Sequence, residues 1–304
     1  MKIDTRSKNV QFPMSNVGLS VIIVSLNVEK LLEDCLKLIF EEIHRPPRYK
    51  FEVIVVDNNS SDDSCQMVKE RFPWVKLIEL RENLGFAKAN NLGAKKARGK
   101  YLLFLNPDTK ICQGSLEKIV KFFKTHLRAG VVGCCLLNAD GSFQPSVGQF
   151  PSILNLLWEK PIDFLERRIR KIRPFLGFFT LKYKRLERPA KVDWVSGAAL
   201  SCRREVFEKL GGFDEQFFMY FEDVDLCLRA KKRGWEVWYL PECKIYHLRG
   251  KSQPAKSRKK AKVYYQSQDY FFQKHRGKIY SLLVKLIRWP YQFLDLRTKV
   301  GRYY

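Results

Sequence analysis

Residues 51–61 read FEVIVVDNNSS. The first six form a short, mostly apolar run rich in β-branched side chains, which predicts a buried strand. The next five, Asp57 to Ser61, are turn formers that can cap a helix from about Asp62 to Arg71. A buried strand that ends in a polar turn and leads into a helix is typical of a parallel sheet covered by helices.

The same alternation continues on both sides of this stretch. Apolar runs predict further strands at residues 19–25, 75–80, 101–105, 131–137 and 235–240. Helical spacing predicts helices at residues 31–43, 85–97, 115–126 and 222–233. We therefore expect an α/β domain with a Rossmann-like, mostly parallel central sheet and helices on both faces.

Polar residues follow three of these strands directly. They are Asp57, the run Arg81 to Asn83, and the run Asn106 to Asp108. The carboxyl ends of parallel strands meet at one edge of the sheet, and ligands bind there in open α/β sheets. The sequence thus predicts a binding site at this edge.

The charge of the chain indicates what kind of partner it binds. The 304 residues include 56 Lys and Arg against 32 Asp and Glu, for a net charge of +24. This excess points to nucleic acid, anionic lipid or a phosphorylated substrate as a partner. It is concentrated in Arg167 to Arg188 and after His247. The eight cysteines include no Cys-x-x-Cys pair, so we expect reduced thiols in a cytosolic protein.

The sequence shows no membrane-crossing signal. Met1 to Asn16 is polar and lacks the apolar core of a signal peptide. No window reaches the roughly 18 uncharged apolar residues that a membrane span requires. We expect a cytoplasmic protein that is soluble or lies on the inner face of the cell membrane.

Three segments carry residues suited to catalysis. The segment Leu105 to Thr109 reads LNPDT, and its Asp108 could bind a divalent cation or simply form a turn. The segment Glu222 to Asp225 reads EDVD at a predicted helix start, where carboxylates either compensate the helix dipole or act as a general base. His247 stands alone as a structural residue or a ligand.

Taken together, the motifs closely resemble those of the family 2 inverting glycosyltransferases of GT-A fold, and within them the rhamnosyltransferase-type enzymes. The resemblance covers about residues 18–250. The motifs that carry it are, in chain order, residues 53–61, Asn83 to Asn91 (NLGFAKANN), Leu105 to Asp108, Ser196 to Ala199 (SGAA), Gly211 to Glu215 (GGFDE), Glu222 to Asp225, and His247.

The resemblance implies a nucleotide-sugar donor site. The loop after the first strand and the end of the second strand would hold the nucleobase and ribose of the donor. The matching residues here are Ser25, Asn27, Glu29 and Asp57. The element that lies along the nucleoside and diphosphate matches Asn83, Gly85, Phe86 and Asn90.

The resemblance also implies a metal site. The family's Asp-x-Asp motif is Asn106-Pro107-Asp108 in this chain, so only Asp108 offers charge, while Asn106 offers a carbonyl oxygen or a hydrogen bond to the nucleotide. His247 matches the second metal ligand. One carboxylate, one imidazole and diphosphate oxygens suit Mg²⁺ or Mn²⁺, and imidazole favours Mn²⁺ slightly.

Asp223 matches the family's catalytic base, which takes the proton of the acceptor hydroxyl as that oxygen attacks the anomeric carbon. Glu222 and Asp225 are the second choices, and Asp225 could instead pair with Arg229 one turn later. The segment Trp194 to Ala199, with Gly197 and Ala198, would line the sugar pocket.

These matches predict an organisation along the chain. We expect an N-terminal extension (1–17), a catalytic domain (18–250) and a basic helical tail (251–304). The domain divides into a nucleotide-binding half (18–115) and an acceptor half (116–250), with a basic-aromatic insertion at about 150–190.

The tail contains an amphipathic pattern. Ile279, Leu282, Leu283 and Leu286 share one helical face, and the opposite face carries Lys278, Ser281, Lys285 and Arg288. This pattern predicts either a helix lying on anionic lipid, near a polyprenyl-diphosphate-linked glycan acceptor, or a helix docked on the domain with a solvated basic face.

Other functions fit less well. A nucleotidyltransferase needs a Gly-rich basic loop after the first strand, but residues 25–29 read SLNVE. A nucleic-acid-binding protein would explain the charge but not the carboxylates, so we expect no nucleic-acid partner. A regulatory, inactive family member is disfavoured because Asp108, Asp223 and His247 are all present. The donor is expected to be dTDP-rhamnose, with a UDP-hexose as the alternative.

Overall fold

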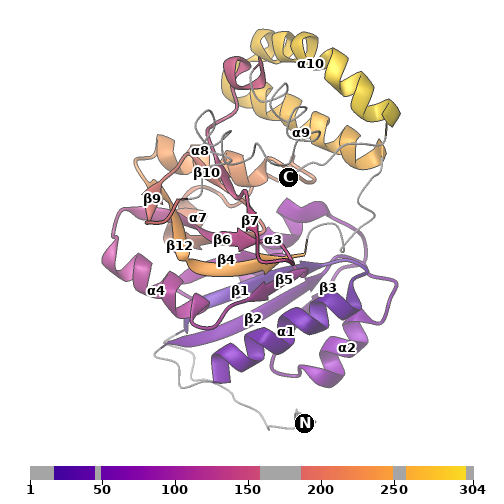
Figure 1. Cartoon of the computed structure of the whole chain (residues 1–304). Coiled ribbons are helices and arrows are strands. Elements are labelled where there is room, and N and C mark those ends of the chain that lie inside the picture. Colours follow the sequence, from indigo (N-terminus) through magenta and orange to yellow (C-terminus); the bar gives the residue numbers. More distant parts are fainter. Residues whose placement is uncertain (1–16, 45–48, 158–185, 249–257, 299–304) are drawn as a thin grey trace.

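The computed structural model describes residues 17–44, 49–157, 186–248 and 258–298. Its core is one sheet in which the strands follow the order β3-β2-β1-β4-β11-β6-β12-β5 (Figure 1). The strands are β1 (Val17–Ser25), β2 (Lys50–Asp57), β3 (Lys76–Glu79), β4 (Tyr101–Leu105), β5 (Thr109–Ile111), β6 (Ala129–Leu137), β11 (Ala199–Arg203) and β12 (Glu236–His247). Four short strands complete the set: β7 (Phe143–Gln144), β8 (Val147–Gly148), β9 (Ala190–Lys191) and β10 (Trp194–Val195).

Four of the seven neighbouring pairs in this strand order run parallel. β1 pairs in parallel with β2 and β4, β2 with β3, and β6 with β12. β11 runs antiparallel between β4 and β6, and β5 runs antiparallel to β12 at the edge. The predicted mostly parallel sheet is confirmed.

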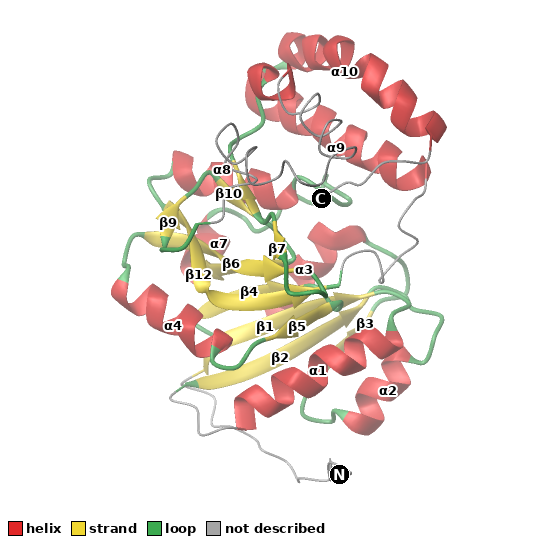
Figure 2. Ribbon diagram, in the orientation of Figure 1, coloured by secondary structure: helices red, strands yellow, loops and turns green. Residues whose placement is uncertain are grey.

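Helices cover both faces of the sheet (Figure 2). One apolar core lies under α1 (Glu29–His44), α2 (Ser64–Arg71) and α4 (Ser115–Thr125). The other lies under α3 (Gly85–Lys96), α7 (Arg204–Lys209) and α8 (Glu222–Lys232). Successive strand residues point to opposite faces, so Val53 and Val55 enter the first core while Ile54 and Val56 enter the second.

β12 is longer than the sequence predicts. It continues past Leu240 to His247, with a register shift against β6 between Leu240 and Lys244. Pro241 lies in that irregular stretch, which is why the apolar pattern stops at Leu240. The extension pairs with β5, a strand of three residues that we did not predict, and sets His247 opposite Thr109.

Two long helices follow the sheet. α9 (Arg258–Arg276) lies between α8 and α10 (Lys278–Thr298), on the side of the molecule away from α1 and α2 (Figure 1). Phe271, Phe272 and Val284 join them to the second core. Within the described residues, no helix combines the length and hydropathy needed to cross a membrane.

The buried face of α10 differs from the one that the docked-helix alternative predicts. A docked helix with a solvated basic face would expose Ser281 and Arg288, but the structure buries both. Ile279 and Leu286 are exposed instead. The expected N-terminal extension, most of the basic-aromatic insertion (158–185) and the start of the tail (249–257) lie outside the described residues.

Candidate active site

The end of β2 is joined to the loop after β1 by a network of hydrogen bonds. Asp57 accepts from the hydroxyl of Ser60 (2.5 Å) and from its N–H (2.8 Å). The Ser60 hydroxyl in turn accepts from the N–H of Asn27 (2.9 Å), and Asn27 Oδ1 accepts from the N–H of Ser61 (2.6 Å). The structure thus brings the predicted residues Asn27 and Asp57 together at one sheet edge.

Asn58 connects this edge to the next segment, although sequence analysis did not select it. Its buried amide donates to Asn83 Oδ1 (2.9 Å) and accepts from the N–H of Leu84 (2.8 Å). Asn83 Oδ1 also accepts from the N–H of Gly85 (2.9 Å). Asp57 and Asn83 were expected to converge. The structure brings them near each other, because Asn58, the residue after Asp57, is hydrogen-bonded to Asn83.

Gly85 meets two demands that only glycine satisfies easily. Its φ is +81°, a left-handed conformation, and a Cβ there would lie 2.6 Å from the carbonyl oxygen of Phe218. The next residue, Phe86, donates its N–H to that same carbonyl (2.7 Å). The start of α3 is thereby fixed against the loop that leads to α8.

The remaining predicted donor residues have different environments. The hydroxyl of Ser25 is buried and has no hydrogen-bond partner in the described part of the chain. Glu29 begins α1, and its N–H donates to Asp62 (3.0 Å). Asn90 is buried inside α3, where its amide donates to the Phe86 carbonyl (2.9 Å), which is a structural role.

Asp108 and His247 come together, as the resemblance implies. Asp108 Oδ1 lies 3.3 Å from His247 Nε2, and both side chains are largely buried. Asn106 Nδ2 lies 3.4 Å from the same ring nitrogen. The antiparallel pairing of β5 with β12 produces this contact, because it sets the strand end at His247 beside the Pro107-Asp108 turn.

Gln144 orients the imidazole and was missed by sequence analysis. Its Oε1 lies 2.7 Å from His247 Nδ1, while its Nε2 donates to Asn138 Oδ1 (2.8 Å) and to the His247 carbonyl (3.1 Å). An amide oxygen can only accept, so Nδ1 donates to Gln144 and Nε2 is the ring nitrogen that faces Asp108. No local sequence pattern marks Gln144, which reaches the site through a two-residue strand.

This arrangement fits a divalent cation with two protein ligands. A metal-bound histidine usually donates its other N–H to a fixed acceptor, as His247 does to Gln144. Among the described residues there is no group of three His, Cys, Asp or Glu side chains that could hold a metal alone. Asp108 and His247 therefore suit a cation whose remaining ligands come from a diphosphate and water.

Lys260 on α9 lies near the same carboxylate. Burial lowers the pKa of Lys260, and the charge of Asp108 opposes this effect. The ammonium group is therefore within electrostatic reach of the candidate metal site. Nothing in the basic tail sequence distinguishes Lys260 from its neighbours.

Asp223 is held by backbone donors at the start of α8. Its Oδ2 accepts from the N–H of Gly197 (2.7 Å) and its Oδ1 from the N–H of Val224 (2.8 Å). Burial raises the pKa of Asp223, and these two N–H groups partly oppose the rise. A half-buried carboxylate with a raised pKa and a fixed orientation is suited to accept a proton.

Backbone contacts connect Asp223 to the metal-ligand pair. Gly197 leads to Ala198, whose carbonyl accepts from the N–H of Asn106 (3.0 Å). Asn106 reaches His247 as described above. Trp194 lies behind this segment, where its indole N–H donates to the carbonyl of Gln149 (2.8 Å). The predicted residues Gly197, Ala198 and Asn106 thus connect Asp223 to the Asp108–His247 pair.

Glu222 and Asp225, the second choices for the base, have other environments. Glu222 is buried, and its Oε2 has no hydrogen-bond partner in the described residues. Burial and then the neighbouring Asp223 charge raise the pKa of Glu222 well above its usual range. Both effects favour the protonated, neutral form of Glu222.

Asp225 is fully buried in an ionic network that joins α8 to α9. Its Oδ2 accepts from Arg229 Nε (2.6 Å), and its Oδ1 accepts from Lys274 Nζ (2.5 Å) and lies 2.8 Å from His275 Nε2. Burial opposes ionisation, but the contacts with His275, Arg229 and Lys274 outweigh it and lower the pKa of Asp225. The alternative pairing with Arg229 is present, and Asp225 fixes the tail rather than the acceptor.

The turn before Asp223 is strained. Tyr220 and Phe221 have φ values of 72° and 68°, which cost energy for residues other than glycine. α9 stabilises this turn, because Ser267 donates to the Met219 carbonyl (2.8 Å) and Phe271 packs against Phe221 with ring centroids 5.5 Å apart. The tail thus supports the base-bearing helix start.

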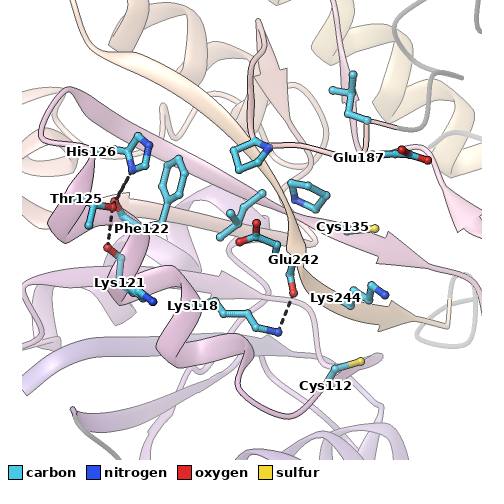
Figure 3. Close-up of a pocket in the computed structure, with 14 residues that line it drawn as sticks. Cys112, Lys118, Lys121, Phe122, Thr125, His126, Cys135, Glu187, Glu242 and Lys244 are labelled. Carbon is cyan, nitrogen blue, oxygen red and sulfur yellow. Dashed lines mark hydrogen bonds between the residues drawn. The ribbon is translucent and has the colours of Figure 1, made fainter.

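A hollow of about 860 Å³ lies elsewhere, between α4 and the irregular part of β12 (Figure 3). Lys118 crosses it and donates to the Glu242 carbonyl (3.0 Å). None of the predicted site residues lines this hollow. The residues suited to catalysis gather at the strand ends instead.

Comparison with known proteins agrees with this geometry. A family model described as "Glycosyl transferase family 2" matches residues 20–211, more than half of the chain. The chain belongs to this family. A second model, "Glycosyl transferase family group 2", matches residues 175–299. The protein is thus a family 2 glycosyltransferase, an enzyme that transfers a sugar from a nucleotide sugar.

Individual relatives of this glycosyltransferase include rhamnosyltransferases. It is 32% identical over 219 residues to the N-acetylglucosaminyl-diphospho-decaprenol L-rhamnosyltransferase of Mycobacterium tuberculosis, covering 66% of this chain and 67% of the relative. It is 25% identical over 223 residues to the rhamnosyltransferase WbbL of Escherichia coli K12, covering 71% and 79%.

The fold is shared with a solved glycosyltransferase structure. The mannosyltransferase PcManGT from Pyrobaculum calidifontis, in complex with GDP-Man and Mn²⁺, superposes with a TM-score of 0.56. The match covers 95% of this chain and 77% of that one at 19% identity. At this identity the likeness concerns the GT-A-type fold alone.

Proposed function

We propose that this enzyme transfers rhamnose from dTDP-rhamnose to a hydroxyl group of a lipid-linked glycan, with inversion at the anomeric carbon. Two relatives named as rhamnosyltransferases support the sugar, and the decaprenol-linked acceptor in one of their names supports the acceptor class. A UDP-hexose is the second candidate donor, because the loop residues that would hold the base accept uracil and thymine alike.

The single observation that carries the mechanism is the position of Asp223. Two backbone N–H groups fix its carboxylate, and Gly197, Ala198 and Asn106 connect it to the Asp108–His247 pair. A base on one side and phosphate-binding groups on the other suit a displacement at a carbon between them. This geometry needs no carboxylate nucleophile.

The proposed step is a single displacement. Asp223 takes the proton of the acceptor hydroxyl while that oxygen forms a bond to the anomeric carbon. The bond from this carbon to the diphosphate oxygen breaks on the opposite face, and the electron pair leaves with the nucleoside diphosphate. The configuration inverts, and the proton then passes from Asp223 to solvent.

Asp108 and His247 would hold Mn²⁺ or Mg²⁺, with Asn106 beside them. When bound, the cation neutralises negative charge on the diphosphate. Gln144 orients the His247 ring so that Nε2 faces this position, and Lys260 adds a positive charge from α9. Ser25 and Asp57 would contact the nucleoside at the other end of the donor.

A transfer assay tests the proposal. The full chain, with Mn²⁺ and a polyprenyl-diphosphate-linked N-acetylglucosamine acceptor, is incubated with dTDP-rhamnose or with UDP-hexoses, and glycolipid and nucleoside diphosphate are quantified. We expect product from dTDP-rhamnose, with inverted linkage by NMR. Product from a UDP-hexose alone would replace rhamnose with the alternative donor, and a retained anomeric configuration would contradict the mechanism.

A further inference from the structure

The exposed and buried faces of α10 are reversed relative to an ordinary surface helix. Ile279, Leu282 and Leu286 are 80%, 58% and 64% exposed, whereas Ser281 and Arg288 are 4% and 2% exposed. A helix in water normally buries its leucines and exposes its arginines. This reversal requires a physical cause and suggests a function.

The cause is a set of polar contacts between α10 and α9. Arg288 binds Asp269 Oδ1 (2.5 Å) and Gln268 Oε1 (2.8 Å), and its guanidinium lies 4.9 Å from the ring centre of Tyr265. The Ser281 hydroxyl donates to the Asp269 carbonyl (3.1 Å). Rotating α10 to bury its leucines would break these contacts and leave buried polar groups without partners.

The outward side of α10 is a continuous apolar stripe. Its residues recur at helical spacing along one face, and they are Ile279, Leu282, Leu283, Leu286 and Trp289. They make up five of the nine large apolar side chains exposed in the described part of the chain. Exposed apolar patches of this kind mark protein or membrane contact sites.

We propose that this stripe binds the surface of a lipid bilayer that contains anionic lipid, with α10 parallel to the membrane plane. Charge selects this partner over a second copy of the chain. Lys278 and Lys285 flank the stripe, no acidic residue occurs between Lys278 and Arg288, and the net charge of +24 makes two copies repel each other. Anionic headgroups attract the same surface.

The helix has the dimensions of an interfacial rather than a spanning element. None of the described helices can cross a membrane, and α10 buries its opposite face against α9. The leucines can enter the boundary between headgroups and acyl chains, while the flanking lysines extend toward lipid phosphates. This inference does not depend on the sugar or on the base proposed above.

Flotation with vesicles tests the proposal in the full chain. The probes are vesicles of phosphatidylcholine alone and of phosphatidylcholine mixed with phosphatidylglycerol. We expect binding to the anionic vesicles that weakens with added salt. Leu286→Ser should weaken it by about tenfold, because burying a leucine contributes at least that factor. Leu127→Ser is the matched control, since Leu127 is 74% exposed but lies outside the stripe.

A triple variant makes the test decisive. Ile279→Ser, Leu282→Ser and Leu286→Ser together should abolish flotation and leave the melting temperature unchanged, because all three side chains are exposed. Flotation of the triple variant equal to that of the wild type would overturn the proposal. A concentration-dependent dimer that the triple variant loses, without vesicle binding by the wild type, would also overturn it and assign the stripe to a second copy.

Discussion

At the scale of single residues, we propose that Asp223 accepts the proton of the acceptor hydroxyl. We expect Asp223→Asn to lower kcat by about 10²- to 10⁴-fold, the usual contribution of a general base, with little change in donor affinity. Burial raises the pKa of Asp223, so the wild-type rate should fall with acidification at a pH above the usual aspartate range, and the variant should lose this dependence. Glu70→Gln on the exposed side of α2 is the control, and a full rate in Asp223→Asn would contradict the assignment.

Glu222 provides a prediction about stability. Because its pKa is raised in the folded protein, the folded state binds this proton more tightly than the unfolded chain does. Its contribution to stability is therefore present in acid and is lost as the pH rises through the raised pKa. Glu222→Gln cannot ionise, so its melting temperature should exceed that of the wild type at neutral pH and match it in acid. An equal difference at both pH values would show that Glu222 is not held neutral.

Gln144 gives a test of the metal-binding geometry. We expect Gln144→Ala to weaken Mn²⁺ binding in the presence of nucleotide by about 10- to 100-fold, the usual effect of removing the group that orients a histidine ligand. Calorimetric titration of Mn²⁺ measures this directly. Asn155→Ala, in the helical turn after β8, is a control with the same type of amide removed away from the site. Unchanged Mn²⁺ affinity in Gln144→Ala would exclude His247 as an oriented ligand.

At the scale of elements, α9 belongs to the catalytic structure rather than to a loose tail. Asp225 on α8 is fully buried between Arg229, Lys274 and His275. We expect Asp225→Asn to lower the free energy of unfolding by about 3–5 kcal/mol, because it leaves the largely buried Arg229 guanidinium without its counter-charge. Urea denaturation measures the change.

The matched control is Asp34→Asn. Asp34 pairs with Lys110 at 3.4 Å, and both side chains are about two-fifths exposed, at 37% and 41%. Exposed pairs of this kind contribute less than about 1 kcal/mol. Equal effects of the two substitutions would show that the α8–α9 network does not hold the helices together.

The elements of the first half of the chain could be predicted from sequence, and the structure shows why. Apolar runs such as residues 51–56 are buried on both faces, so their composition alone identifies strands. β5, α7 and the extension of β12 could not be predicted. α7 has only six residues, too few for a clear helical period. β5 is short and the extension of β12 follows Pro241, so pairing with distant strands decides both rather than local propensity.

The candidate site was predictable only in part for a related reason. Asp108, Asp223 and His247 lie in recognisable motifs, but Gln144 contacts His247 across more than a hundred residues of sequence. Lys260 is likewise distant in sequence from Asp108, whose charge acts on its pKa. The sequence left open which face of α10 is exposed, because both an interfacial and a docked helix fit its pattern. Helical periodicity located the apolar stripe. Which face of α10 is buried depends on the ion pair between Arg288 and Asp269 on α9, which no local pattern predicts.

At the scale of the whole molecule, the sheet edge, the base-bearing helix and the tail form one structure. The residues proposed to bind the donor lie at the ends of β1, β2 and β4. Asp223 lies in the first turn of α8, and α9 supports the turn before it. α10, which carries the exposed stripe, lies on the far side of α9 from α8 (Figure 1). If α10 binds the membrane as proposed, it would orient the enzyme toward a membrane-bound acceptor.

The most direct test of the central claim is a thermal-shift titration of the purified full chain with dTDP, UDP and GDP, each with and without Mn²⁺. A ligand that binds only the folded state raises the melting temperature. We expect dTDP to raise the melting temperature, and Mn²⁺ to increase this rise. In His247→Ala, the additional rise caused by Mn²⁺ should be lost. No shift with any nucleotide at concentrations far above the micromolar range would contradict a nucleotide-sugar site at this sheet edge.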